Sequence, residues 1–541
     1  MKKHLFPLLL IIITGSLLIA AIFHSGWYTS HDGVYHILRT EEALRMFKLG
    51  QFPLRWAGTL DQGFGIPLFN FVYPLPYYSS AMLSIFVGSV WAVKTVIILS
   101  YLMGGLGIYT LFCGKNKFVG FALALIYLMT PYQFLNIFVR GALGEIMAMG
   151  LIPWVMVMFT SLARKGANLK WYYPIPLSLL FAAHNFLGIL FVVFLLGYAI
   201  FQSENKRPVF ISIALSFGVA SFFLLPMILE RSLLYSLDRQ IFTFNFEQHF
   251  VYLKQLFYGK WDYWYSLPGP VDGMSFQLGV AQILLSILGI GAIIFSKKHF
   301  WSSLYLIMAY FGSLFLMTSR SFLIWDKISI LQTVQFPWRL LFMATILTPL
   351  LGYFFINKIK SRQIQTIFLC GLIAFSFWNV RNYRRPMKQL TASEYTDLYL
   401  LNLGKTTSTF RTEILPKWSV INERFKSEEL LVNAGNMTID ALATDPLKIE
   451  ITINNKPDPN TGRITILRNY YPGWVAIMDG KKKLELTPTD EGMITMQPEI
   501  GVHTYIITMN STNIEKASNL LSFISVFGLG VLWHKNRHKN K

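Results

Sequence analysis

Long apolar runs recur along most of this chain, and they limit its fold more than any other feature. A run near 20 residues spans the roughly 30 Å hydrocarbon core of a bilayer as an α-helix, which satisfies its own backbone hydrogen bonds there. Only 14% of the residues are charged and 53% are hydrophobic, whereas soluble domains have charge on roughly a quarter of their residues. We therefore expect an α-helical polytopic membrane protein.

The apolar runs predict about twelve membrane helices. They are bounded by polar or basic residues, which sets each end to within a few positions. The expected helices cover residues 5 to 23, 92 to 112, 118 to 134, 142 to 162, 173 to 183, 186 to 201, 208 to 230, 276 to 296, 301 to 317, 338 to 356, 363 to 380 and 516 to 533.

The charge distribution predicts how the helices are oriented. Lys plus Arg (48) exceed Asp plus Glu (28), but the basic residues gather in short loops between apolar runs, so the surplus indicates topology and no nucleic-acid partner. The positive-inside rule then places both termini in the cytoplasm of a cell-membrane protein. The cytoplasmic loops are expected at Lys2-Lys3, Lys115 to Lys117, Arg164 to Lys170, Lys206-Arg207, Lys297-Lys298, Lys358 to Arg362 and His534 to Lys541.

This topology leaves three long segments outside the cell. Two are the loops 24–78 and 231–275 of a transmembrane domain, residues 1–380. The third is the polar segment 381–515, before the final helix and basic tail of residues 516–541.

Segment 381–515 has the alternating apolar and polar pattern of β-strands. The pattern runs from Leu447 to Ile453, from Arg463 to Leu467 and from Ile494 to Met509, and Asp479-Gly480 predicts a tight turn. We expect an extracytoplasmic β-sandwich-like domain. Its Tyr470-Tyr471 pair and Trp474 are either part of the core or a platform for carbohydrate.

The first outward loop places ionisable and aromatic side chains directly after a membrane helix. If a second helix begins after Asp32, its dipole favours that carboxylate, and His36 shares the same face. Asp32 is then either a helix cap or a functional acid. The side chains of His31, Asp32 and His36 are also suitable ligand types for a divalent metal.

Motifs over most of the chain support a family resemblance. They are Asp32 to His36, Gly50 to Trp56, Gly63 to Phe69, Tyr73 to Tyr78, Arg140 to Glu145, His184-Asn185, Gln335 to Arg339, Tyr470 to Trp474 and Asp479-Gly480. With these motifs the chain resembles bacterial membrane proteins labelled 6-pyruvoyl-tetrahydropterin-synthase-related. Those proteins are similar to the YfhO-like group and to the wider GT-C glycosyltransferases.

The resemblance implies an inverting glycosyltransferase. GT-C enzymes move a sugar from a polyprenyl-phosphate-linked donor at the outer membrane face, here to a glycopolymer or glycolipid of the cell surface. An acid in their first outward loop is catalytic, and Asp32 matches its position. Its carboxylate would take the proton of the acceptor hydroxyl, a role that typically contributes about 10² to 10⁴ in rate.

The same mechanism needs cations beside the departing lipid phosphate, where negative charge grows. Arg55, Arg140 and Arg339 lie at outward helix ends or loops, and the guanidinium fork suits phosphate. His36, Glu145 and His184 complete the expected substrate-binding set.

Several of these residues also have structural interpretations. Arg339, next to Trp338, is typical of an interfacial anchor. Arg140 and Glu145 are spaced to pair, because an acid beside an apolar run needs compensation. His184 and Asn185 suit a break between two helices in the ambiguous stretch 171–201.

The second outward loop contains the run Trp261-Asp262-Tyr263-Trp264-Tyr265. Aromatic faces beside an acid suit a sugar, but Trp and Tyr also collect at membrane interfaces, which is the interpretation that we favour from sequence. Two other functions remain open for the whole chain. One is a transporter or flippase for lipid-linked saccharides, and the other is a non-catalytic scaffold that binds surface polysaccharide through residues 381–515.

Overall fold

The computed structural model describes most of the 541 residues. The described ranges are 2–114, 116–235, 246–295, 300–332, 334–403, 414–420, 429–433, 436–457 and 462–539. Lys115, Lys297 and Lys298 of the predicted cytoplasmic loops lie outside the described residues, as do the last two residues of the tail.

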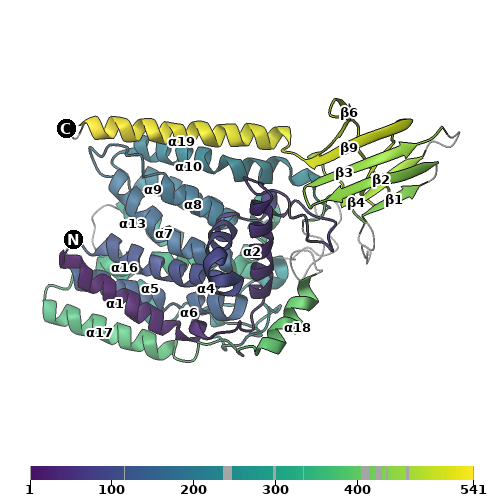
Figure 1. Cartoon of the computed structure of the whole chain (residues 1–541). Coiled ribbons are helices and arrows are strands. Elements are labelled where there is room, and N and C mark those ends of the chain that lie inside the picture. Colours follow the sequence, from purple (N-terminus) through teal and green to yellow (C-terminus); the bar gives the residue numbers. More distant parts are fainter. Residues whose placement is uncertain are drawn as a thin grey trace.

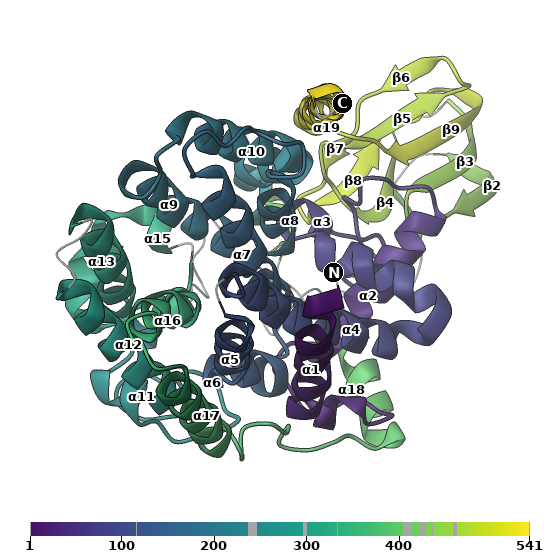
Figure 2. The same ribbon diagram turned by 90° about the vertical axis from the view of Figure 1, so that its left-hand side faces the viewer.

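Helices make up the larger part of the molecule, and the long ones run side by side (Figures 1 and 2). The principal helices are α1 (Lys2–Leu18), α2 (Gly33–Lys48), α3 (Leu68–Phe71), α4 (Leu75–Phe112), α5 (Lys117–Leu128), α6 (Pro131–Phe134), α7 (Leu143–Leu162), α8 (Ile175–Ala183), α9 (Asn185–Phe201), α10 (Lys206–Leu229), α11 (Leu253–Phe257), α12 (Val280–Ile294), α13 (Phe300–Leu316), α14 (Phe322–Lys327), α15 (Ser329–Gln332), α16 (Leu341–Ile356), α17 (Arg362–Asn379), α18 (Ala392–Leu403) and α19 (Asn513–Lys539).

Every range predicted as a membrane helix contains a helix. Within the described ranges, five helices are long and apolar enough to cross a membrane: Leu75–Phe112, Leu143–Leu162, Lys206–Leu229, Pro337–Ile356 and Asn513–His538. Two bent pairs raise this to seven if each pair is one span, Lys117–Leu128 with Pro131–Arg140 and Leu304–Leu316 with Ser319–Lys327. These helices agree with the expected membrane character by their length and composition. Twelve spans stay a prediction, because helices such as Asn185–Phe201 and Val280–Ile294 are shorter.

The first outward loop differs most from expectation. The predicted range 24–78 contains α2, which runs across the bundle (Figure 1). Helix α4 begins at Leu75 and not near residue 92, and it bends at Gly88, whose φ of +76° is non-helical. Only the first turns of α4 are polar or aromatic, and residues 81–91 are largely apolar, so the prediction began this helix too late.

The ambiguous stretch 171–201 is the predicted helix pair. Helix α8 ends at Ala183 and α9 begins at Asn185, with an extended His184 between them. The His184 Nδ1 atom accepts a hydrogen bond from the Leu187 backbone N–H at 3.3 Å, so this imidazole caps α9.

Two antiparallel sheets confirm the β-rich segment. One has the order β1-β4-β8-β7 and the other β2-β3-β9-β5-β6. Asp479 and Gly480 both have positive φ, +49° and +69°, in the turn that joins β5 to β6, as their sequence predicts. The strands are β1 (Leu430–Asn433), β2 (Met437–Thr444), β3 (Lys448–Asn455), β4 (Arg463–Asn469), β5 (Trp474–Met478), β6 (Lys482–Leu484), β7 (Thr487–Pro488), β8 (Met493–Met496) and β9 (Gly501–Met509).

Both sheets contribute to one buried apolar core, which also contains Trp56 from the first loop. The Trp56 ring lies 6.0 Å from that of Tyr471 and 5.9 Å from that of Trp474. Tyr471 and Trp474 are therefore core residues and not an exposed platform. The first loop completes the interior of the β domain.

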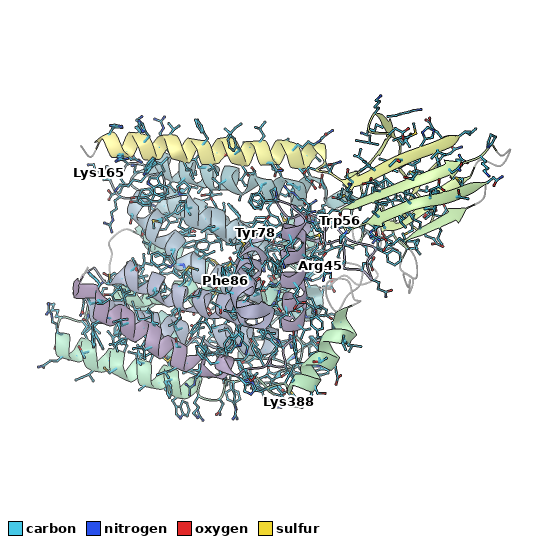
Figure 3. All side chains as sticks on the ribbon, viewed as in Figure 1. Arg45, Trp56, Tyr78, Phe86, Lys165 and Lys388 are labelled. Carbon is cyan, nitrogen blue, oxygen red and sulfur yellow. The ribbon has the colours of Figure 1, made fainter. Side chains whose placement is uncertain are left out.

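The two ends of the molecule differ. Both chain termini lie at one end and the β domain lies at the other (Figure 1). Lys165, in the basic loop 164–170, is at the end with the termini, and Trp56 is at the junction with the β domain (Figure 3). This arrangement matches the relative placement that the charges predict, and the side of the membrane that each end faces stays a prediction.

Candidate functional site

Glu145 is the centre of a buried charged cluster. It lies in the first turn of α7 and is 1% exposed. Its carboxylate oxygens lie 2.7 Å from Arg140 Nη1 and 2.9 Å from Arg339 Nε, and the Tyr132 hydroxyl donates to it at 2.8 Å. The His184 Nε2 atom is 3.9 Å away. We call Glu145, Arg140, Arg339, Tyr132 and His184 the Glu145 cluster.

The guanidinium groups of the cluster make further contacts that fix their planes. Arg140 donates to Asn136 Oδ1 at 2.7 Å and lies over the Trp338 ring at 4.7 Å. Arg339 donates to the Val334 carbonyl oxygen at 2.7 Å. Arg339 is therefore paired inside the protein, and the sequence interpretation of a simple interfacial anchor is wrong.

Two arginines thus share one carboxylate, which leaves a positive surplus among these three side chains. Arginine has five N–H donors in a fixed fork, so both cations retain donors beyond those that Glu145 accepts. A buried charge in a membrane protein is costly unless it is paired. Here Glu145 pairs with both arginines, so these three side chains together have one positive charge in excess. Such a site favours an anion.

Asp32 stands beside this cluster and precedes α2. Its backbone N–H donates to the Arg140 carbonyl oxygen at 2.9 Å, and the His31 N–H donates to that of Val139 at 3.0 Å. Gly141 permits this approach: its φ is +66°, and a Cβ there would lie 2.9 Å from Ser30 Oγ. The acceptors are the last carbonyls of the π-helical turn Leu135–Arg140, a kind of turn often found at functional sites.

The Asp32 side chain differs from a helix cap. Asp32 occupies the N-cap position of α2 but makes no side-chain cap hydrogen bond. Within the described ranges its carboxylate has no hydrogen-bond or ion-pair partner, and the residue is half-buried. Arg140 and Arg39 lie within electrostatic range of it. The sequence left a cap or a functional acid open. The missing cap hydrogen bond argues against the cap, and a functional role for this acid stays a prediction.

His36 and Arg39, one turn apart on α2, both contact the Tyr77 hydroxyl. The distances are 2.9 Å from His36 Nδ1 and 3.0 Å from Arg39 Nη1. The Tyr73 ring stacks on Tyr77 at 6.0 Å and on His184 at 5.2 Å. This aromatic link connects α2 with the Glu145 cluster.

The three residues considered for a metal do not form a metal site. His36 Nε2 accepts the Leu143 backbone N–H at 3.4 Å, so both of its ring nitrogens are engaged. His31 Nε2 lies 3.3 Å from the Tyr263 carbonyl oxygen. In the part of the chain that the structure describes, no three His, Cys, Asp or Glu side chains are grouped to hold a metal ion. A divalent metal therefore does not fit His31, Asp32 and His36.

Arg55 is the expected phosphate ligand that the structure places elsewhere. It donates to Asn70 Oδ1 at 3.1 Å and to Asn519 Oδ1 at 2.7 Å, and its Nε lies 4.0 Å from Glu515 Oε2. We call Arg55, Asn70, Glu515 and Asn519 the Arg55 junction, because they join the first loop to the start of α19. The sequence did not separate this arginine from the other two, since all three precede or follow apolar runs.

Sequence reasoning missed Tyr132 and gave Tyr73, Tyr77 and Arg39 no role. A signal for Arg39 is its spacing from His36, because residues three apart share a helix face. Tyr132 gives no such signal, since only the bend between α5 and the turn Leu135–Arg140 brings it to Glu145.

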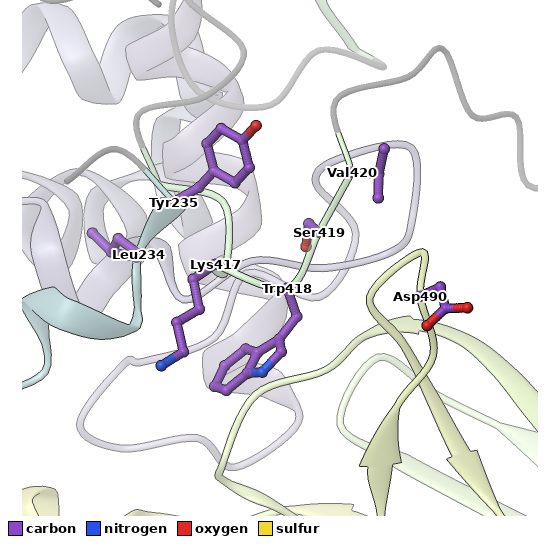
Figure 4. A pocket seen from close by; sticks show the side chains of 7 residues that line it. All are labelled: Leu234, Tyr235, Lys417, Trp418, Ser419, Val420 and Asp490. Atoms are coloured by element: carbon purple, nitrogen blue, oxygen red, sulfur yellow. The ribbon is translucent and has the colours of Figure 1, made fainter. Parts of the chain in front are cut away.

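Two pockets lie next to the β domain. One, of about 370 Å³, is lined by Leu234, Tyr235, Lys417, Trp418, Ser419, Val420 and Asp490 (Figure 4). The other, of about 230 Å³, lies between residues 58–63 and the strands. Neither includes a residue of the Glu145 cluster, so they are separate from the charged site.

A comparison with protein families identifies a membrane-protein family. The family described as "6-pyruvoyl-tetrahydropterin synthase related domain; membrane protein" matches residues 69–383, a range that contains the Glu145 cluster but not Asp32. A search of curated proteins gives no match. Among solved structures, the arabinofuranosyltransferase AftD from Mycobacteria is similar, with 13% identity and a TM-score of 0.46.

The similarity to AftD covers 73% of this chain but 28% of AftD, so the chain spans less than a third of that protein's length. The family match covers more than half of the chain, and it confirms the resemblance that the motifs indicated. The chain belongs to the family of membrane proteins that have a 6-pyruvoyl-tetrahydropterin-synthase-related domain.

Proposed function

We propose that the protein is a membrane glycosyltransferase. It moves a sugar from a polyprenyl-phosphate-linked donor to a cell-surface glycopolymer or glycolipid, at the outer face of the cell membrane. The observation that supports this most is the contrast between two neighbouring acids. Glu145 is saturated by two arginines and a tyrosine, whereas the half-buried Asp32 has a carboxylate without a side-chain partner among the described residues.

Asp32 is the general base of this proposal. An acceptor hydroxyl oxygen attacks the anomeric carbon as the bond from that carbon to the phosphate oxygen breaks. The hydroxyl proton passes to the Asp32 carboxylate, and the bonding electrons leave with the lipid phosphate. Attack from the side opposite the phosphate inverts the anomeric centre.

Arg140 and Arg339 bind the phosphate. Their shared partner Glu145 neutralises only one of the two charges, so the site has a positive surplus where the leaving group gains negative charge. Arg140 also lies within electrostatic range of Asp32, which puts base and phosphate site on adjoining groups. His36 and His184 position α2 and the start of α9 around them.

The test uses the purified full chain in proteoliposomes with polyprenyl-phosphate-linked pentoses and hexoses. We expect Asp32→Asn to lower sugar transfer by about 10² to 10⁴ without changing the yield or melting temperature of the protein. Asp397→Asn, on α18, is the matched control and should retain activity. Full transfer by Asp32→Asn would refute this mechanism.

The same vesicles separate the alternatives. Movement of donor across the bilayer without a covalent product would identify a flippase. Absence of both transfer and movement, with polysaccharide still bound, would identify a scaffold. Reporter fusions after residues 60 and 450 test the topology, and both should report the outside of the cell.

A further inference from the structure

The aromatic run Trp261–Tyr265 is held in one conformation by its neighbours. The Trp261 ring stacks on Tyr383 with centroids 4.2 Å apart. The Tyr263 hydroxyl donates to the Arg385 carbonyl oxygen at 2.9 Å. Two members of the run thus anchor it to residues 383–385.

The next two rings are largely exposed. Trp264 is 60% exposed and Tyr265 is 47% exposed, although the Trp264 backbone N–H is fixed by the Gly273 carbonyl oxygen at 2.8 Å. Their rings meet edge to face at 5.6 Å. Ser266, the following residue, lies 3.0 Å from His249 Nδ1. A rigid backbone therefore presents two adjacent aromatic faces to the surroundings.

These rings adjoin the proposed base. Tyr265 stacks on the His31 ring with centroids 4.4 Å apart, and Asp32 is the next residue in the chain. Partial burial and the negative charge of Asp32 both raise the pKa of the Tyr265 phenol. Tyr265 therefore contacts the residue that directly precedes the proposed base, and the Trp264 ring adjoins Tyr265.

We infer that Trp264 and Tyr265 form the binding subsite for an uncharged saccharide acceptor. This inference rests on the proposed function, because it assigns the acceptor side of the same site. The C–H faces of a sugar pack on aromatic rings, and its hydroxyls pair with polar groups at their edge. The phenol of Tyr265 and the carboxylate of Asp262 supply such groups.

The local charge distinguishes a saccharide from a lipid headgroup. Asp32 and Asp262 are both acidic, and Asp262 is paired with Lys260 at 3.2 Å. The two aromatic faces supply no cation for an anionic phospholipid headgroup, whereas the proposed phosphate site has Arg140 and Arg339. A neutral polyol needs no cation, and its hydroxyls can donate hydrogen bonds to carboxylate oxygens.

Saccharide binding is measured with the full chain in lipid nanodiscs on an array of neutral di- to tetrasaccharides. We expect Trp264→Ala and Tyr265→Ala to weaken binding on the order of tenfold. Tyr265→Phe retains the ring but loses the phenol hydroxyl, so it should weaken binding less than Tyr265→Ala does. Tyr258→Ala removes a ring that is 76% exposed in the same segment and is the matched control, which should bind as the wild type does.

The variants also separate this inference from the proposed function. Asp32→Asn keeps an acceptor oxygen at this position, so it should lose transfer while weakening saccharide binding less than Trp264→Ala does. If the wild type shows no sugar transfer but its saccharide binding depends on Trp264 and Tyr265, the proposed transferase activity is refuted and the binding subsite is supported. Unchanged binding by correctly melting Trp264→Ala and Tyr265→Ala, or no binding by the wild type, would overturn the subsite and leave these rings as membrane-interface residues.

Discussion

Arg339 Nε and Glu145 Oε1 lie 2.9 Å apart although 194 residues separate them in the chain. The contact joins the turn before α16 to the first turn of α7. Since Arg140 binds the other carboxylate oxygen at 2.7 Å, one acid fixes two cations from distant segments. The positive site is therefore a product of the bundle's packing.

Removal of Glu145 should destabilise the bundle strongly. Glu145→Ala leaves Arg140 and Arg339 buried without their anion, and loss of one partner from a buried pair costs about 3–5 kcal/mol. We expect a large fall in melting temperature in detergent. Glu204→Ala, in the loop before α10, is the control, and an equal fall in that variant would contradict this role.

Gly141→Ala should displace Asp32. The site has φ of +66°, which costs an ordinary residue roughly 1–2 kcal/mol, and the new Cβ would lie 2.9 Å from Ser30 Oγ. Sugar transfer should fall sharply. Gly166→Ala is matched, because Gly166 also has positive φ but no atom near its Cβ position. Similar transfer by both variants would mean that the 30–33 contact is dispensable.

His36 makes stability depend on pH. Burial lowers its pKa well below 6.5, and the charges of Arg39 and Arg140 lower it further. As the pH falls below 6.5, His36 becomes protonated in the unfolded chain but stays neutral in the folded chain. The free energy of unfolding therefore decreases toward acid pH. His36→Gln removes this term. The melting temperature of the variant should therefore fall less than that of wild type between about pH 7.5 and 5, and parallel curves would argue against it.

Arg55→Ala should loosen the attachment of the β domain without a direct effect on donor binding. The change removes hydrogen bonds to Asn70 and Asn519 and the cation near Glu515, and a bond to a charged group contributes about 1.5–3 kcal/mol. We expect faster proteolysis between the β domain and the helices at an unchanged KM for the donor. Arg45→Ala on α2 is the control. A raised KM for the donor with a normal rate of proteolysis would show instead that Arg55 binds the donor phosphate.

Trp56→Ala should unfold the β domain preferentially. The ring is fully buried between Tyr471 and Trp474, and Trp→Ala changes in cores cost about 3–5 kcal/mol. Hydrogen exchange of β3 and β9 should rise more than that of α7. Trp533→Ala, at an exposed position on α19, should leave exchange unchanged.

The sequence predicted features that depend on local pattern. Hydropathy located the helices, alternation located β3 and β4, and short spacing predicted the Arg140–Glu145 pair. Long-range packing lay beyond it. No local pattern distinguishes Arg339, which joins Glu145, from Arg55, which joins Glu515. Similarly, residue spacing cannot indicate that the backbone around Asp32 packs against Gly141.

The position of Trp56 has a consequence for how the protein can vary among homologues. Its ring and the Asn469–Asp61 hydrogen bond of 2.8 Å make the extended first loop and the C-terminal sheets one solvent-excluding unit, although about 400 residues separate them in the chain. Homologues should therefore gain, lose or vary these two regions together. A chimera that exchanges only the sheets between relatives would inherit a mismatched ring at their centre.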